Sequence, residues 1–150
     1  MKSTILIGAE CTGKTRTIVE ELIPQLKDNM VYVLSNKPQY RECQNITIVN
    51  EQDEFLKIMN ETHMYTNVWY IVDNQEVIHP DLSAKLAAYK NVIFSRETLS
   101  PEYDSLFERI FLFKIDKVDF NSEILTLDLK AFVLNQGFRE FITFYTQPQV

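Results

Sequence analysis

Residues 8 to 15 read G-A-E-C-T-G-K-T, and this stretch decides the fold. It matches the pattern G-x-x-x-x-G-K-[ST], with Gly8, Gly13, Lys14 and Thr15 in the four fixed places. The glycines of this pattern let the backbone wrap closely around phosphate oxygens, and backbone N–H groups at the start of the following helix attract the anion. Two of the chain's three glycines lie here. We therefore predict a phosphate-binding loop over residues 8–15, called the phosphate loop below.

The side chains of the phosphate loop predict how a nucleotide is held. We expect Lys14 to act as a catalytic cation that reaches the β- and γ-phosphates, and the Thr15 hydroxyl to bind Mg²⁺. Arg16 follows directly, and we expect it on the surface of the helix. The predicted nucleotide-binding residues of this segment are Gly8, Ala9, Glu10, Cys11, Thr12, Gly13, Lys14, Thr15 and Arg16.

Short apolar runs alternate with amphipathic segments on either side of the loop. The runs predict strands at 4–7, 31–34, 46–49, 68–72, 92–94 and 110–115. Helices are expected over 14–26, after a cap at Asn50 or Asp53, over 81–89, and from Ser100-Pro101 onward. Strands separated by helices imply parallel β-α-β units. We therefore predict a three-layer α/β/α domain with a mainly parallel central sheet of about five strands.

The last third of the sequence has a weaker pattern. Residues 123–129 alternate like a strand with one wet face, and residues 130–145 suggest a helix interrupted near Gly137. No linker rich in Pro, Gly or Ser interrupts the chain. We predict one domain over residues 1–150, with 115–150 as a C-terminal extension packed on it.

Composition narrows the class of protein. A hydrophobic fraction of 45% in 150 residues supports a real core, and the net charge of −6 argues against a broad electrostatic footprint on nucleic acid. The two cysteines are too few for a disulfide framework. No apolar run is long enough to span a membrane. We expect a cytoplasmic protein without a membrane partner.

A second acidic position follows a strand. Asp73 comes directly after V-W-Y-I-V, residues 68–72, and a phosphate loop requires a partner carboxylate that holds Mg²⁺ at the end of a buried neighbouring strand. Thr15 and Asp73 are therefore the predicted metal-binding residues, with Mg²⁺ and ATP, or another nucleoside triphosphate, as the expected cofactors.

In these motifs the sequence resembles the P-loop NTPases of the additional-strand type. Most hydrolysing members of that group carry a glutamate after the aspartate, which polarises the attacking water. This chain reads D-N-Q-E from Asp73, so Asn74 stands where that glutamate is expected. Glu76 is the predicted substitute, with Glu10 as another candidate, and the resemblance leaves open whether the nucleotide is hydrolysed.

The order of elements over residues 1–115 also resembles phage and plasmid ATPases related to DNA-pumping motors and to zonula-occludens-toxin-like assembly proteins. The resemblance rests on G-A-E-C-T-G-K-T, V-W-Y-I-V-D and N-V-I-F-S-R-E. In such proteins a polar residue at the end of the N-V-I-F-type strand senses the γ-phosphate, and Ser95 matches that position. Arg96 is either a second sensor, a finger that reaches a neighbouring subunit, or a surface residue paired with Glu97 or Asp73.

Three functions remain open at this stage. The first is a nucleotide-binding protein, with weak ATPase activity, of phage or mobile-element type that acts with a protein partner or as a homo-oligomer. The second is a small nucleotide or nucleoside kinase, although the five arginines are scattered rather than clustered as a lid would require. The third is a non-hydrolysing, nucleotide-dependent interaction module, which Asn74 favours. No motif that reads the base is present.

Overall fold

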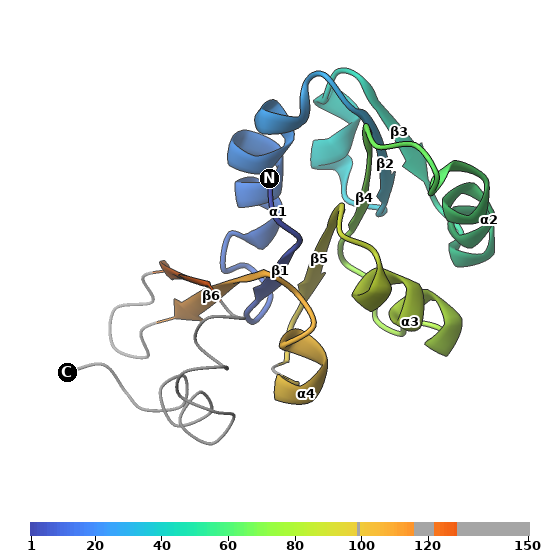
Figure 1. Ribbon diagram of the computed structural model, residues 1–150. Helices are drawn as coiled ribbons and strands as arrows, with labels where there is room; N and C mark the ends of the chain where they lie inside the picture. Colours follow the sequence, from blue (N-terminus) through green and yellow to red (C-terminus); the bar gives the residue numbers. More distant parts are fainter. Residues whose placement is uncertain (99, 116–121, 129–150) are drawn as a thin grey trace.

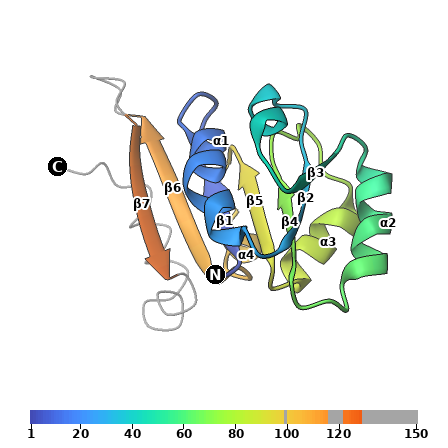
Figure 2. The ribbon, with the colours of Figure 1, turned by 90° about the horizontal axis from the view of Figure 1, so that it is seen from above.

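A seven-stranded sheet forms the middle of the structure, and helices cover both of its faces (Figures 1 and 2). The structure is a computed structural model and describes residues 1–98, 100–115 and 122–128. The strands lie in the order β3-β2-β4-β5-β1-β6-β7. They are β1 (Thr4–Ile7), β2 (Met30–Leu34), β3 (Ile46–Val49), β4 (Val68–Val72), β5 (Val92–Arg96), β6 (Arg109–Ile115) and β7 (Ser122–Asp128).

The sheet is wider than the predicted five strands. β1 to β6 pair in parallel, and β7 adds an antiparallel edge against β6, with Arg109 opposite Asp128. The alternating pattern at 123–129 therefore predicted a real strand. The three-layer, mainly parallel α/β/α architecture is confirmed. The helix predicted over 130–145 lies outside the described residues, and the division into one domain with a 115–150 extension stays a prediction.

In the described part of the chain, seven helical segments connect the strands. They are α1 (Lys14–Thr17), the π-helical η1 (Ile18–Leu22), the 3₁₀ segments η2 (Ile23–Leu26) and η3 (Pro38–Glu42), α2 (Gln52–Thr62), α3 (Pro80–Ala88) and α4 (Pro101–Asp104). The helix predicted over 14–26 is thus one helical stretch of three geometries, and Pro24 lies in its 3₁₀ end. The predicted cap of α2 was wrong: Glu51 is the N-cap residue, and it makes no capping side-chain hydrogen bond.

Two hydrophobic cores lie on opposite faces of the sheet because side chains along each strand alternate. The first core faces α2, α3 and α4, and the second faces α1, η1, η2 and η3 (Figure 2). The first comprises Ile5, Ile7, Leu34, Val49, Phe55, Met59, Val68, Tyr70, Val72, Leu82, Leu86, Val92, Phe94, Phe107, Ile110 and Leu112. The second comprises Leu6, Ile18, Leu22, Ile23, Leu26, Val31, Val33, Tyr40, Trp69, Ile71, Ile93, Phe111 and Phe113.

The strand order decides where polar residues meet. β5 lies between β1 and β4, so one additional strand separates the phosphate loop's strand from the strand that ends before Asp73. Because β1, β4 and β5 are parallel, the phosphate loop, Asp73 and Ser95 all lie at the carboxyl edge of the sheet. In open α/β sheets, ligands bind outside the carboxyl ends of the strands.

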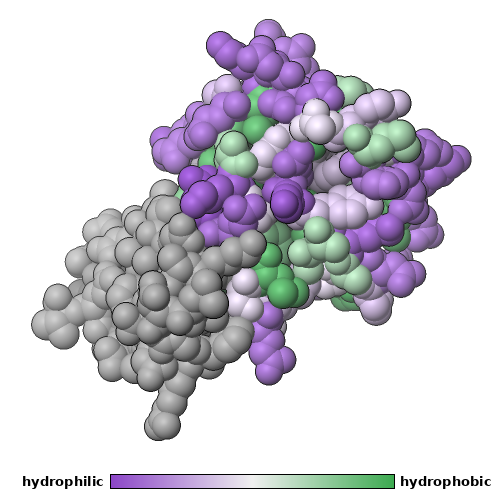
Figure 3. All heavy atoms as spheres, in the orientation of Figure 1, coloured by the Kyte–Doolittle hydropathy of each residue, from purple (hydrophilic) through white to green (hydrophobic). Residues whose placement is uncertain are grey.

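The surface is mostly polar on the face drawn in Figure 3, where hydrophobic residues occupy only small areas among hydrophilic ones. Among the residues that the structure describes, no helix has the length and apolar character needed to cross a membrane.

Candidate functional site

The backbone of the phosphate loop has a positive φ at one of its glycines, as expected, and also at a residue that is not glycine. Gly13 has φ = 98°, in the left-handed region, and Cys11 also has a positive φ of 63°. A Cβ on Gly8 would lie 2.6 Å from Cβ and 2.7 Å from the backbone oxygen of Phe113, so Gly8 is required by close approach to β6. The Thr12 hydroxyl closes the loop by donating to the Ala9 carbonyl at 2.7 Å.

Lys14 is enclosed by backbone carbonyl groups. Its ammonium group donates to the carbonyl oxygens of Gly8, Ala9 (3.5 Å) and Arg96 (3.3 Å). Burial lowers the pKa of Lys14, while the negative charges of Asp73, Glu97 and Glu10 counteract this shift. All the hydrogen bonds of this half-buried ammonium group go to neutral carbonyl oxygens, so no negative group of the described residues is hydrogen-bonded to it. An anion at this position would stabilise its charge.

The carboxylate of Asp73 accepts hydrogen bonds from hydroxyl groups of three elements. Its Oδ2 accepts from Thr15 Oγ1 of α1 and from the Tyr40 hydroxyl of η3, each at 2.7 Å, and its Oδ1 accepts from Ser95 Oγ of β5. The side chain is 2% exposed. Burial, together with the nearby Asp73 charge and this hydrogen bond, raises the pKa of Tyr40, so its hydroxyl keeps the proton that it donates.

These residues fit a magnesium ion. Mg²⁺ prefers oxygen ligands and uses one or two protein groups, completing its shell with waters and nucleotide phosphates. The Thr15 hydroxyl and the Asp73 carboxylate supply such oxygens side by side, 2.7 Å apart. The described residues hold no cluster of three or more His, Cys, Asp or Glu side chains that would bind a metal by itself. A magnesium ion here would therefore depend on the nucleotide for its remaining ligands.

The position after Asp73 forms a tight turn. Asn74 has φ = 59°, and its amide donates to Asn36 Oδ1 at 2.9 Å. Glu76 is exposed beyond this turn, and Glu10 is exposed in the phosphate loop. Glu97, which the sequence did not single out for this role, follows β5 directly. The β1–β5 register pairs Ile7 with Arg96, so Glu97 follows beside Gly8.

Arg96 has a partner other than the two predicted for it. Its guanidinium group pairs with Asp104 of α4, which is 0% exposed, and lies 5.0 Å from the ring centroid of Tyr103. Burial lowers the pKa of Arg96. The predicted pairing with Glu97 or Asp73 is wrong, because the strand alternation puts Arg96 on the face of α4, opposite to Ser95. Held in this way, Arg96 fastens α4 to β5.

Arg16 lies where its position in the helix predicted. It is exposed and forms a surface ion pair with Glu20, one helical turn on, at 3.0 Å. Surface pairs of this kind contribute little to stability. Its guanidinium group pairs with Glu20 and with none of Lys14, Thr15 and Asp73, so it stands apart from the cluster around Asp73.

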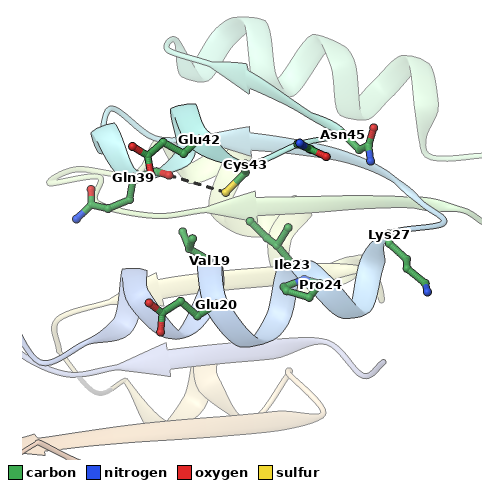
Figure 4. A pocket seen from close by; sticks show the side chains of 10 residues that line it. Val19, Glu20, Ile23, Pro24, Lys27, Gln39, Glu42, Cys43 and Asn45 are labelled. Carbon is green, nitrogen blue, oxygen red and sulfur yellow. Dashed lines mark hydrogen bonds between the residues drawn. The ribbon is translucent and has the colours of Figure 1, made fainter.

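A cavity of about 540 Å³ lies on the same sheet face as α1 (Figure 4). It separates η1 and η2 from η3 and the following loop, and the phosphate loop does not line it. The Cys43 thiol on its wall donates to the Gln39 carbonyl at 3.8 Å. The lining residues are Val19, Glu20, Ile23, Pro24, Lys27, Gln39, Glu42, Cys43, Gln44 and Asn45.

Known structures resemble this architecture, although neither a protein-family model nor a curated protein matches the sequence. The genome-packaging NTPase B204 of Sulfolobus turreted icosahedral virus 2 in complex with AMPPCP superposes with a TM-score of 0.60 at 16% identity, over 99% of this chain and 88% of that one. Its complex with ATP-gammaS gives 0.56 at 15% identity, over 99% and 87%.

A second protein, the ATPase DotB of Legionella pneumophila, superposes with a TM-score of 0.60 at 12% identity. The match covers 97% of this chain and 52% of DotB, so this chain spans about half of DotB's length. At such identities the similarity concerns the fold. This chain therefore shares the fold of the B204 NTPase and of the ATPase DotB, in agreement with the three-layer α/β/α architecture that the sequence predicted.

The structure brings together Lys14, Thr15, Asp73 and Ser95, which were predicted from three separate motifs. It adds Tyr40 and Asp104, which sequence reasoning missed. Tyr40 lies in the 3₁₀ turn after β2, a position without a motif, and only the parallel pairing of β2 with β4 carries it to Asp73. Asp104 lies in the short helix α4, and no local sequence pattern marks it as the buried partner of Arg96.

Proposed function

We propose that this chain binds a magnesium–nucleoside triphosphate, with ATP as the first candidate, at the carboxyl edge of its sheet. The observation that carries the proposal is the convergence of the phosphate loop, the enclosed Lys14 and the Thr15–Asp73 pair. In this assignment the backbone of residues Gly8 to Arg16 surrounds the phosphates, the Lys14 side chain contacts the β- and γ-phosphates, and Ser95 lies near the γ-phosphate. Thr15 and Asp73 hold Mg²⁺, which supplies charge neutralisation between the phosphates when bound.

Structural neighbours support a role as an ATPase. B204 is a genome-packaging NTPase, and DotB is an ATPase. We infer a weak ATPase of phage or mobile-element type that works as a homo-oligomer or with a protein partner, in the cytoplasm. The acidic net charge of −6 gives no support to extensive nucleic-acid contact by the chain alone.

Hydrolysis requires a group that polarises water, and the position after Asp73 offers only the amide of Asn74. Glu76 is the residue we propose for this task, with Glu97 and Glu10 as the competitors whose charges act on Lys14. Replacing each by Gln in turn would identify the base, because only loss of the polarising carboxylate would lower turnover without weakening nucleotide binding.

The test is the melting temperature of the full chain with and without Mg²⁺-ATP, Mg²⁺-ADP and Mg²⁺-GTP. A ligand that binds only the folded state raises the melting temperature. Lys14→Ala should abolish the rise with ATP, whereas Lys57→Ala, on the exposed side of α2, should retain it. An unchanged rise in Lys14→Ala would overturn the assignment of the phosphate loop.

Turnover on the same samples separates the three functions. Phosphate release without an added acceptor supports the ATPase. ADP formation only when a nucleoside or nucleotide is supplied supports the kinase. Stabilisation by nucleotide without any turnover supports an interaction module that does not hydrolyse.

A further inference from the structure

The connection between β2 and β3 contacts the candidate magnesium site, although its sequence contains no motif that predicts this contact. β2 and β4 pair in parallel with Leu34 opposite Val72, so the segment after β2 runs beside Asp73. The backbone N–H of Asp73 donates to the Leu34 carbonyl at 3.1 Å. Two residues of the connection then contact the strand end: Asn36 accepts from Asn74, and Tyr40 donates to Asp73.

Tyr40 is fixed on two sides. Its side chain is 0% exposed and belongs to the second core, together with Trp69 and Ile71 of β4. Its backbone lies in η3, where its carbonyl accepts from the Cys43 N–H at 3.1 Å. A ring held by the core has little freedom, so its hydroxyl is presented to Asp73 Oδ2 in one place.

The orientation of the Asp73 carboxylate depends on hydrogen-bond donors held in fixed positions. Tyr40 and Ser95 donate to different oxygens of the carboxylate, from η3 and from β5, and together they determine its orientation. The third donor, Thr15, is itself the hydroxyl that would bind the ion. Hydrogen-bonding partners of metal-binding groups commonly determine metal affinity by orienting those groups.

We propose that Tyr40 is a positioning residue of the magnesium–nucleotide site, whose hydroxyl fixes the carboxylate of Asp73 in the orientation that receives the ion. The proposal rests on the nucleotide-binding function proposed above. It assigns to η3 a role in nucleotide recognition without any contact to the nucleotide itself.

The experiment is a Mg²⁺ titration of the melting temperature at saturating ATP, for the wild type and Tyr40→Phe. This substitution keeps the ring that packs in the second core and removes only the hydroxyl. Loss of a partner of this kind typically costs 10–100-fold in metal affinity, so we expect the Mg²⁺ concentration at half of the effect to rise by about 10-fold. The shift caused by ATP in the presence of a chelator should be the same in both proteins.

The matched control is Tyr70→Phe. Tyr70 is 2% exposed, its hydroxyl lies 2.6 Å from Thr62 Oγ1, and it belongs to the first core, on the opposite face of the sheet from Tyr40. It loses a buried hydroxyl as Tyr40→Phe does, and its Mg²⁺ titration should match that of the wild type.

The outcomes are distinct. An unchanged Mg²⁺ titration in Tyr40→Phe, or an equal shift in Tyr70→Phe, would overturn the role of Tyr40 and leave nucleotide binding in place. Absence of any nucleotide effect in the wild type would overturn the proposed function and this inference with it. If Tyr40→Phe destabilises the fold, direct titration of fluorescent ATP with Mg²⁺ at low temperature provides the same comparison.

Discussion

Gly8 and Gly13 serve the phosphate loop for different physical reasons, and substitutions can separate them. Gly8 lies so close to Phe113 that a Cβ would meet backbone atoms at 2.7 Å, whereas Gly13 has open space but a φ of 98°. We expect Gly8→Ala to cost about 1–3 kcal/mol through overpacking. Gly13→Ala should cost about 1–2 kcal/mol through its left-handed backbone.

Substitution by asparagine distinguishes overpacking at Gly8 from backbone strain at Gly13. Asn tolerates the left-handed region better than Ala does, so Gly13→Asn should recover part of the stability that Gly13→Ala loses. Gly8→Asn should be no better than Gly8→Ala, because its larger side chain meets the same backbone. Urea unfolding of the four variants measures this, and recovery at Gly8 would contradict the steric account.

Asp73→Asn tests the metal assignment at the same scale. The substitution keeps the size of the side chain but replaces one acceptor oxygen by an amide donor, which faces hydroxyl groups that now donate. We expect a loss of about 1–3 kcal/mol in stability. The melting rise with ATP should no longer depend on Mg²⁺. Asp28→Asn, at an exposed position, is the control, and retained Mg²⁺ dependence in Asp73→Asn would show that another carboxylate binds the ion.

At the scale of elements, the ion pair between Arg96 and Asp104 holds α4 to the end of β5. Asp104 is 0% exposed and also accepts the Ser100 N–H at 2.8 Å, while the Arg96 side chain is 21% exposed. Removing one partner of a buried pair leaves an uncompensated charge, so Asp104→Ala should cost about 3 kcal/mol.

The surface pair between Arg16 and Glu20 is the natural comparison. Its side chains are 79% and 59% exposed, and Arg16→Ala should change stability by less than about 0.5 kcal/mol. Chemical denaturation of both variants checks the prediction. Equal effects would mean that Asp104 contributes no more than a solvent-exposed carboxylate.

The elements also show what the sequence could predict. The phosphate loop, the strand before Asp73 and the strand before Ser95 carried their own signals, since apolar runs with a polar end are local patterns. The place of Tyr40 depended on which strands become neighbours, and β2 pairs with β4 only through long-range packing. The cap of α2 was misplaced because Glu51, without a capping hydrogen bond, precedes the helix, and its first residue, Gln52, is hydrogen-bonded to the distant backbone of Val77 and His79.

The helical stretch after the phosphate loop shows the same limit. Its apolar spacing predicted one helix from Lys14 to Leu26, and the extent was right, but it changes from α to π to 3₁₀ geometry. Pro24 cannot donate a backbone hydrogen bond, which accounts for a change of pairing near it. Periodicity reports which face is buried and is insensitive to such local changes in hydrogen bonding.

At the scale of the whole molecule, the two cores share one sheet, and β1, β2, β4, β5 and β6 each contribute buried side chains to both. In β1, Ile5 and Ile7 belong to the first core and Leu6 to the second. Loss of packing on one face therefore weakens the strands that build the other. We expect unfolding of the described part to be cooperative, and a perturbation confined to the first core to lower the stability of the site built from the second.

Alkaline pH acts on buried tyrosines of both cores, because burial raises the pKa of Tyr40 in the second core as well. Burial raises the pKa of Tyr70 and of Tyr103 above the ordinary value of 10.0, in the first core and packed against it. A folded pKa above the unfolded one gives stability that is complete below pH 10 and is lost as pH rises beyond it. Lys14 has the opposite effect on stability. Its pKa is lowered in the folded state, so just below pH 10.5 the unfolded chain binds more protons and this contribution to stability rises with pH.

We expect the double variant Tyr70→Phe/Tyr103→Phe to flatten the alkaline decline in stability. Each buried tyrosine can contribute at most about 1.4 kcal/mol per pH unit above pH 10, because a single proton is involved. Urea unfolding between pH 7 and 11.5 measures the slope, and Tyr65→Phe, at an exposed position, is the control. If the double variant declines as steeply as the wild type, these two hydroxyl groups do not govern alkaline unfolding.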